Sequence, residues 1–231
     1  SRNLFPGYAV RAVTNGVHAH TWVSPAFAKI FDRHLPGWCN EPEILVRADC
    51  CVGANAIWQA HLISKNELLQ YVCESTGVQL DLEQPIVGFA RRMTSYKRPE
   101  LLFSDLERLR SIARRTPFQI VLAGKAHPRD MEGKEHITRV HAALRALAPD
   151  IKGVYLNNYN MTMAKLLVAG ADVWLNTPQP PLEASGTSGM KAAMNGVPSL
   201  SVLDGWWAEG CIEGVTGWAI GEACPFDASL A

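Results

Sequence analysis

The chain has 231 residues, 48% of them hydrophobic and 19% charged, which is enough for one substantial core. Its 22 Lys and Arg residues balance its 22 Asp and Glu residues, so no overall field directs it to nucleic acid or to an acidic membrane. No apolar run reaches the length of a bilayer span and the N-terminus has no signal-peptide pattern, so we expect a cytoplasmic protein without a membrane partner.

A turn at Asn15-Gly16 opens the informative part of the chain. The next polar residues, His18 and His20, lack a third ligand nearby, so we expect hydrogen-bonded turn residues and no metal. The six cysteines have no Cys-x-x-Cys spacing, which favours reduced thiols in this compartment. These are Cys39, Cys50, Cys51, Cys73, Cys211 and Cys224.

The range 25–43 is predicted to be loop and short helix, and the range 43–76 to be one helix. Apolar residues recur there near the 3.6-residue helical period, and Gly77 is the expected C-cap. This pattern is typical of a packing helix, so its aromatic residue, Trp58, is expected in the core rather than at a ligand.

From residue 84 onward short apolar strands alternate with amphipathic helices, which predicts an α/β fold with a parallel sheet covered by helices on both faces. The expected strands are 86–90, 118–123, 153–156, 171–175, 199–203 and 218–220. The expected helices are 98–114, 131–147, 161–169 and 187–195. Ligands of such sheets bind at the carboxyl ends of the strands, where the polar motifs of this chain fall.

Four cations follow the first strand within eight residues, in the run Arg91-Arg-Met-Thr-Ser-Tyr-Lys-Arg98. Cations at the start of a helix conflict with the helix dipole, and an anion bound between them removes the conflict. We therefore favour a phosphate site over a solvated basic helix start. The turn Gly124-Lys-Ala-His-Pro128 after the second strand implicates Lys125 and His127 only weakly.

The fourth strand leads through a proline-rich loop to Glu183-Ala-Ser-Gly-Thr-Ser-Gly-Met-Lys191-Ala-Ala-Met-Asn-Gly196. A helix beginning near Thr187 would turn its free N–H groups and its dipole toward an anion. Lys191 lies one turn into that helix, where it can act as a counter-ion or, when desolvated, as a nucleophilic amine. Farther on, Trp206 and Trp207 have two open interpretations, a sugar platform or core packing.

The lysine segment, together with Thr14-Asn-Gly, the Tyr-Lys-Arg run and Gly-Lys-Ala-x-Pro, resembles the α-glucan (glycogen, starch and maltodextrin) phosphorylases. The run Asp204-Gly-Trp-Trp-Ala-Glu-Gly210 resembles the short, bacterial-type branch. The resemblance implies a Rossmann-like sheet that forms the C-terminal half of a two-domain GT-B-type glycosyltransferase. It divides the chain into an interdomain segment with packing helices, 1–83, and a cofactor- and phosphate-binding domain, 84–231.

The resemblance also implies roles for residues of this chain. Arg92 and Lys97 would be catalytic and hold the substrate phosphate. Pyridoxal phosphate would form a Schiff base with Lys191. The other cofactor-binding residues would be Arg91, Trp22, Tyr159, Gly186 and Thr187, and the sugar-binding residues Asn15, Tyr96, Glu183, Ala184, Ser185 and Gly186. Asn160 stands where the family often has arginine, so no charge is expected there.

The implied reaction is reversible phosphorolysis of α-1,4-glucan to glucose 1-phosphate with retention of configuration. Its partners are the glucan, inorganic phosphate and an N-terminal domain of the same protein. Because phosphorylases are much longer, we expect a fragment that is inactive alone.

Three other classes fit parts of the pattern. A nucleotide-sugar glucan synthase would need no pyridoxal, and the Met190-Lys191 run argues against it. A noncatalytic glucan-binding domain could use the tryptophans to bind sugar, whereas the intact set of Arg92, Lys97 and Lys191 argues for an ancestry in catalysis. A pyridoxal enzyme of amino-acid metabolism lacks an identifiable Asp partner for the pyridinium nitrogen.

Overall fold

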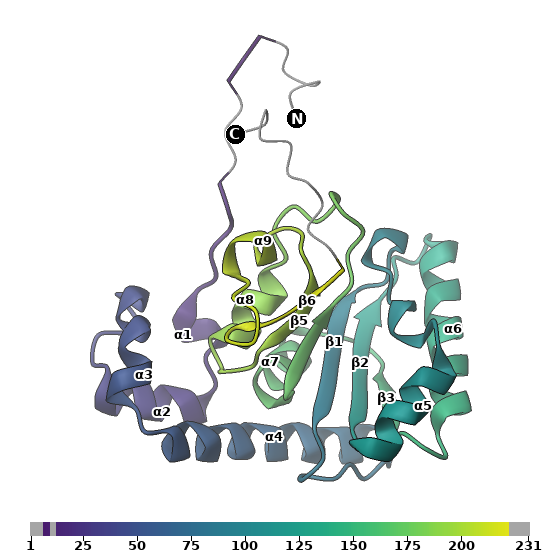
Figure 1. Cartoon of the computed structure of the whole chain (residues 1–231), viewed down its shortest axis with the longest axis horizontal. Helices are drawn as coiled ribbons and strands as arrows, with labels where there is room; N and C mark the ends of the chain where they lie inside the picture. The colour runs from purple at the N-terminus through teal and green to yellow at the C-terminus, as the bar shows by residue number, and fades with distance from the viewer. Residues whose placement is uncertain (1–6, 10–12, 222–231) are drawn as a thin grey trace.

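A computed structural model describes residues 7–9 and 13–221 and contains one six-stranded sheet with the strand order β3-β2-β1-β4-β5-β6. All five strand pairs are parallel, as expected for an α/β fold (Figure 1). The strands are β1 (Ile86–Arg92), β2 (Gln119–Lys125), β3 (Gly153–Leu156), β4 (Val173–Asn176), β5 (Ser199–Val202) and β6 (Gly217–Ile220). The predicted Rossmann-like sheet is thus confirmed.

Helices cover both faces of the sheet. The longer ones are α2 (Pro25–His34), α4 (Ala54–Thr76), α5 (Leu106–Arg115), α6 (Met131–Leu147), α7 (Met161–Gly170) and α8 (Thr187–Ala193). The short ones are α1 (Ala19–Trp22), α3 (Ala48–Cys51), α9 (Trp207–Gly210) and the 3-10 helices η2 (Pro42–Arg47), η3 (Ser95–Lys97) and η4 (Leu101–Phe103). Within the described residues no helix has the length and apolar character needed to cross a membrane.

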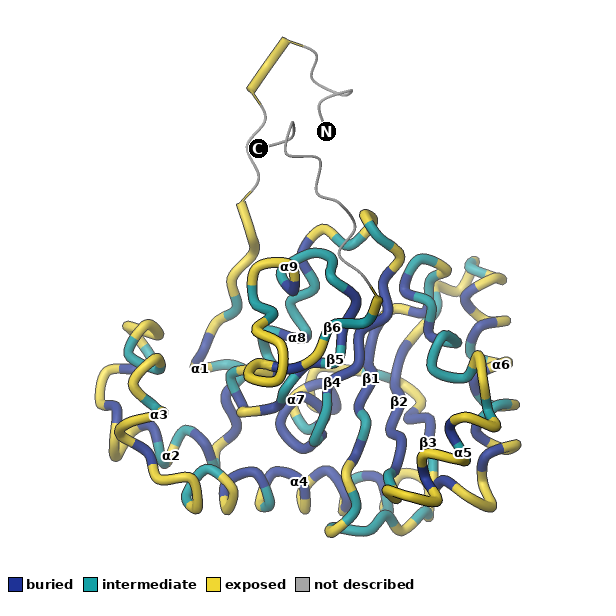
Figure 2. The backbone as a smooth tube through the Cα atoms, in the orientation of Figure 1, coloured by how far each residue is buried: buried dark blue, intermediate teal, exposed yellow. Residues whose placement is uncertain are grey.

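The alternation of side chains along each strand builds a separate core on each face. On one face, Val121 and Ala123 of β2 pack with residues of α4 and α7. On the other, Ile120 and Leu122 of β2 pack with residues of α5 and α6. Buried residues therefore dominate the central strands, as Figure 2 shows. A sheet buried on both faces leaves the strand ends for function.

The N-terminal helices differ from the prediction in two respects. The expected helix over 43–76 is interrupted, because Gly53 is extended (φ −66°, ψ 141°) and separates α3 from α4. Trp58 was expected in the core, and this was wrong: the residue is 54% exposed. The apolar period of α4 is satisfied by Leu68, Leu69 and Val72, which pack on the sheet.

The helix expected over 98–114 also begins later. Arg98 adopts a left-handed conformation (φ 44°) that ends η3, and α5 begins only at Leu106, where the Asp105 side chain accepts a hydrogen bond of 2.8 Å from the N–H of Arg108. The cationic run is therefore not at a helix N-terminus. The conflict between these cations and a helix dipole is therefore absent, and support for a bound anion must come from the contacts that the cations make.

Candidate functional site

Two of the predicted cations meet on one carboxylate. Arg91, the penultimate residue of β1, lies 2.6 Å through Nη2 from Oε2 of Glu183. Lys97, at the end of η3, pairs with the same oxygen through Nζ. Arg91 is only 8% exposed and Lys97 5%. Arg91 was predicted to bind the cofactor phosphate, Lys97 the substrate phosphate and Glu183 the sugar. The structure places both cations against one oxygen of Glu183.

A clamp between two loops holds Lys97 in place. The hydroxyl of Thr177, just after β4, donates to the carbonyl oxygens of Lys97 and Arg98, each at 2.9 Å. Arg98 in return donates through Nε to the carbonyl of Thr177 at 3.0 Å and through Nη2 to that of Pro178 at 2.6 Å. Sequence reasoning gave Thr177 no role and grouped Arg98 with the phosphate cations. Its guanidinium instead binds carbonyl groups and fixes the backbone beside Lys97.

The loop before α8 turns polar groups into the same region. The N–H of Glu183 donates to Oδ2 of Asp204 at 2.9 Å, and the carbonyl oxygen of Ser185 accepts from the N–H of Trp206 at 2.8 Å. Gly186 has φ 82°, a conformation that favours glycine. Among the described residues, the N–H groups of Ala184, Ser185 and Gly186 donate to no protein acceptor. Within the described part of the chain, the loop therefore presents three N–H donors without protein partners.

A small cavity separates this loop from the ends of β4 and β5. Its volume of about 10 Å³ is room for roughly one water. It is lined by Arg91, Asn176, Pro178, Glu183, Ser185, Gly186, Ser201, Asp204 and Trp206. Three of its atoms are buried without a hydrogen-bond partner in the described part of the chain, namely Nη1 of Arg91, Oδ1 of Asn176 and Oγ of Ser185. These groups suit an oxyanion or a sugar hydroxyl.

Lys191 lies on α8 with its amine against an aromatic ring. Its Nζ is 3.8 Å from the centre of the Trp22 ring. Burial lowers the pKa of the Lys191 amine, which increases the neutral fraction that can act as a nucleophile. Sequence reasoning had placed both residues near a cofactor, and the structure brings them together.

Asn195 connects these two residues and was not singled out from the sequence. Its Nδ2 donates to the carbonyl oxygens of Trp22 and Lys191, each at 2.8 Å, and its Oδ1 accepts from the N–H of Ser24 at 2.7 Å. The residue is fully buried. Asn195 therefore fixes the segment that carries Trp22 onto the end of α8.

Two tyrosines from the predicted set flank the cations. Tyr96 presents its ring to Nζ of Lys97, 4.4 Å from the ring centre. Tyr159, which follows β3, is half-buried, and this burial raises the pKa of its hydroxyl although the positive charge of Arg91 acts in the opposite direction. Tyr159 thus stays a neutral hydrogen-bonding group near Arg91.

Other predicted residues are exposed and separate from this cluster. Within the described residues, Arg92 and Asn15 make no ion pair or side-chain hydrogen bond, and Lys125 and His127 are also exposed. Of the adjacent tryptophans, Trp207 is buried in the core, whereas Trp206 lines the small cavity. Core packing therefore describes Trp207, whereas Trp206 is the ring of the pair that faces the site, where a sugar platform would be.

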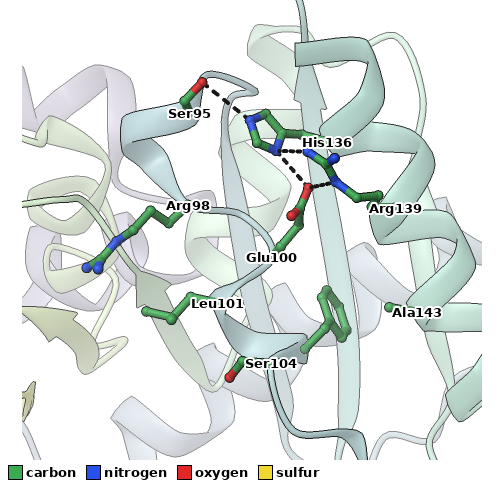
Figure 3. Close-up of a pocket in the computed structure, with 9 residues that line it drawn as sticks. Ser95, Arg98, Glu100, Leu101, Ser104, His136, Arg139 and Ala143 are labelled. Carbon is green, nitrogen blue, oxygen red and sulfur yellow. Dashed lines mark hydrogen bonds and ion pairs between the residues drawn. The ribbon is translucent and has the colours of Figure 1, made fainter. Parts of the chain in front are cut away.

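A larger cavity of about 460 Å³ lies outside the motif residues, between η3, η4 and α6 (Figure 3). Its polar side is an internal network, in which Glu100 Oε1 accepts from Arg139 Nε at 2.7 Å and lies 2.7 Å from His136 Nδ1. Burial opposes the charge of Glu100, but the hydrogen bonds from Arg139 and His136 outweigh it and lower the pKa of this carboxyl. Because its charged groups satisfy one another, this cavity is not the candidate site.

Comparison with known proteins agrees with the site motifs. A family model described as carbohydrate phosphorylase matches residues 3–212. The chain is 41% identical to the maltodextrin phosphorylase of Thermococcus litoralis, 40% to the glycogen phosphorylase of Aquifex aeolicus and 39% to that of Mycobacterium tuberculosis. These matches cover 92%, 91% and 93% of this chain but 28%, 33% and 27% of the relatives, so the chain spans a third or less of their length. On both grounds, this chain belongs to the carbohydrate phosphorylase family.

Proposed function

We propose that the protein to which this chain contributes is an α-1,4-glucan phosphorylase, which releases glucose 1-phosphate reversibly and with retention of configuration. Membership of the family supports this, and the observation that carries it is the convergence of two buried cations, Arg91 and Lys97, at the carboxyl ends of β1 and β4. Glu183 provides one negative charge for these two positive charges, and the remaining positive charge suits phosphate, the co-substrate of phosphorolysis.

Pyridoxal phosphate fits the residues present. The partly desolvated amine of Lys191 suits covalent attachment, and Nη1 of Arg91, which has no hydrogen-bond partner among the described residues, suits the cofactor's phosphate. The remaining cofactor-binding residues would be Trp22, Tyr159, Gly186 and Thr187. When bound, the cofactor supplies a phosphate group that exchanges a proton with the substrate phosphate.

The reaction needs groups that hold the attacking phosphate and groups that hold the sugar. Arg92 and Lys97 are proposed for the phosphate, where each charge-assisted hydrogen bond contributes about 1.5–3 kcal/mol. Phosphate held in this way also stabilises the positive charge that develops on the glucosyl ring in the transition state.

The glucosyl unit is assigned to a second group of residues. Glu183 and the free N–H groups of the loop after it provide acceptors and donors for hydroxyls, and Asn15 and Tyr96 complete the set. A site built to pair every hydroxyl rejects sugars that lack one, because its own polar groups are then left unpaired. The remaining length of the relatives leaves room for a further domain, which we propose closes over this edge and excludes water.

The cofactor assignment is tested by borohydride reduction of the protein after incubation with pyridoxal phosphate, followed by peptide mass mapping. We expect a pyridoxyl group on Lys191 and none in Lys191→Arg, which keeps a cation beside Trp22 but has no nucleophilic amine. A pyridoxyl group on Lys97 or Lys125, with Lys191 unmodified in the wild-type chain, would contradict the assignment.

Activity is tested on the complete protein by measuring glucose 1-phosphate formed from maltodextrin and inorganic phosphate. Turnover that requires phosphate supports phosphorolysis. Transfer from a nucleotide sugar, with no product from phosphate, would favour the glucan synthase instead.

A further inference from the structure

Glu183 has different partners in the structure and in the proposed reaction. In the structure its Oε2 neutralises both Arg91 and Lys97, and its side chain is 8% exposed. In the reaction Arg91 and Lys97 bind phosphates and Glu183 binds sugar hydroxyls. Oε2 already accepts from both cations, so only Oε1 of this carboxylate is open to a hydroxyl.

Electrostatics explains the arrangement that is seen. Two cations buried together are costly without a counter-charge, because burial removes their hydration. Glu183 is the acidic residue that forms an ion pair with either cation among the described residues. The carboxylate of Glu183 also leaves little space for a phosphate, since the adjoining cavity has a volume of only about 10 Å³. An entering phosphate must therefore take over the cations and move the Glu183 side chain.

We propose that Glu183 is a resident counter-ion that phosphate displaces: the cofactor's phosphate on Arg91 and the incoming substrate phosphate on Lys97. This proposal rests on the proposed function for the identity of the anion. The exchange is a movement of charge without covalent bond formation: phosphate oxygens replace Oε2, and both oxygens of the carboxylate become available to the sugar hydroxyls assigned to it. Phosphate binding would thereby prepare the sugar site, which couples the two substrates through one side chain.

The local contacts allow such a movement. The backbone of Glu183 is fixed by the hydrogen bond of its N–H to Asp204, whereas within the described residues the two cations are the only recorded partners of its side chain. Rotation of the side chain therefore breaks the two ion pairs and no other recorded contact. The partner-free Nη1 of Arg91 and Oγ of Ser185 are available to the entering anion.

The first test is the affinity of inorganic phosphate, measured by titration calorimetry without glucan. Glu183→Gln removes the competing charge and retains the side-chain shape, so we expect phosphate to bind at least about tenfold more tightly, which equals about 1.4 kcal/mol. Glu100→Gln is the matched control, because Glu100 also pairs with two basic side chains, Arg139 and His136, but lines the other cavity. Its phosphate affinity should stay within about twofold of the wild type, a margin well below 1.4 kcal/mol.

Equal or weaker phosphate binding by Glu183→Gln would overturn the proposal, as would an equal gain in Glu100→Gln. A second test uses only the wild-type protein, in case the variant does not fold. Carbodiimide labelling of carboxyl groups, read by mass spectrometry, should modify Glu183 several-fold more in the presence of phosphate, while Glu100 stays constant. Unchanged or lower labelling of Glu183 would also overturn it.

These tests are independent of turnover. Failure to form glucose 1-phosphate would refute the proposed function, and the exchange would still be decided by phosphate affinity and labelling. Phosphorolysis with an unresponsive Glu183 would refute the exchange alone.

Discussion

Asp172→Asn is expected to be strongly destabilising. Asp172 stands at the amino end of β4, where its carboxylate lies 2.9 Å from both His61 Nε2 and Lys65 Nζ on α4 and accepts the N–H of Ile86 at 2.8 Å. Lys65 is only 2% exposed, and its other recorded acceptor is the carbonyl of Gln84 at 2.9 Å. Removing the negative charge leaves a buried ammonium group without a counter-ion, which costs about 3–5 kcal/mol.

Urea unfolding of the chain measures this cost. With a slope of about 3 kcal/mol per molar urea, the midpoint should fall by about 1–1.7 M. Asp150→Asn is the control, because Asp150 pairs with Arg110 and Arg114 at the surface, where such a pair contributes at most about 1 kcal/mol. A loss below about 1 kcal/mol for Asp172→Asn would refute the argument that the buried ammonium needs this carboxylate.

A second variant identifies the cause. Adding Lys65→Met to Asp172→Asn removes the unpaired ammonium, so the double variant should be more stable than Asp172→Asn alone. Strictly additive losses would mean that the pair is not coupled.

The pH dependence has a definite sign. Burial opposes the charge of Asp172, but hydrogen bonds from His61, Lys65 and Ile86 outweigh it, so the pKa of this carboxyl is below its ordinary value of 3.8. A lowered pKa in the folded state contributes stability that is present above pH 3.8 and is lost as the pH falls through the folded-state pKa. Asp172→Asn should lack this part of the acid destabilisation.

Three further outcomes are expected at the site. Arg92→Ala should raise the KM for phosphate more than the KM for glucan in the complete enzyme. Lys125 is the register partner of Arg92 on β2, and Lys125→Ala should change neither KM. Equal effects of Arg92→Ala on both substrates would mean that Arg92 is structural. Gly189→Ala would place a Cβ 2.7 Å from the indole nitrogen of Trp206, and it should lower the free energy of unfolding in urea by about 1–3 kcal/mol. Gly53→Ala is the control, because its Cβ would meet nothing within 4 Å, and it should cost less than about 1 kcal/mol. Because burial lowers the pKa of Lys191, its labelling by pyridoxal phosphate and borohydride should reach half-maximal rate at a lower pH than that of free Nα-acetyl-lysine, and equal midpoints would contradict this.

The strands could be predicted from the sequence because each is a short apolar run between turn signals, and their alternation with helices determines a parallel sheet. The structure of the connection after β1 could not be predicted in this way. Leu101, Leu102 and Leu106 continue an apolar period that does not distinguish 3-10 turns from an α-helix, and the left-handed conformation of Arg98 has no sequence signal of its own. The exposure of Trp58 could not be predicted, because an apolar period does not show which of its residues the rest of the fold covers.

The residues of the candidate site were largely identified from their motifs, but their pairing was not. Lys97 and Glu183 are separated by 86 positions, and they meet because β1 and β4 are neighbours in the sheet. That neighbourhood depends on the strand order, which alternation alone does not determine. The clamp formed by Thr177 and Arg98 was missed for the same reason, since it joins the loops after these two strands.

Asn195 shows how a motif residue can be required without touching a ligand. At its position two carbonyl oxygens need donors and one N–H needs an acceptor, and these belong to Trp22, Lys191 and Ser24. A primary amide provides both kinds of group, whereas a carboxylate has no donor and an aliphatic side chain has neither. The hydrogen bonds of Asn195 hold the Trp22 segment against α8, and the ring of Trp22 contacts the amine of Lys191. The surroundings that lower the pKa of Lys191 are thus built partly by a residue just past the C-cap of α8, which explains why the motif extends past the lysine to Asn195.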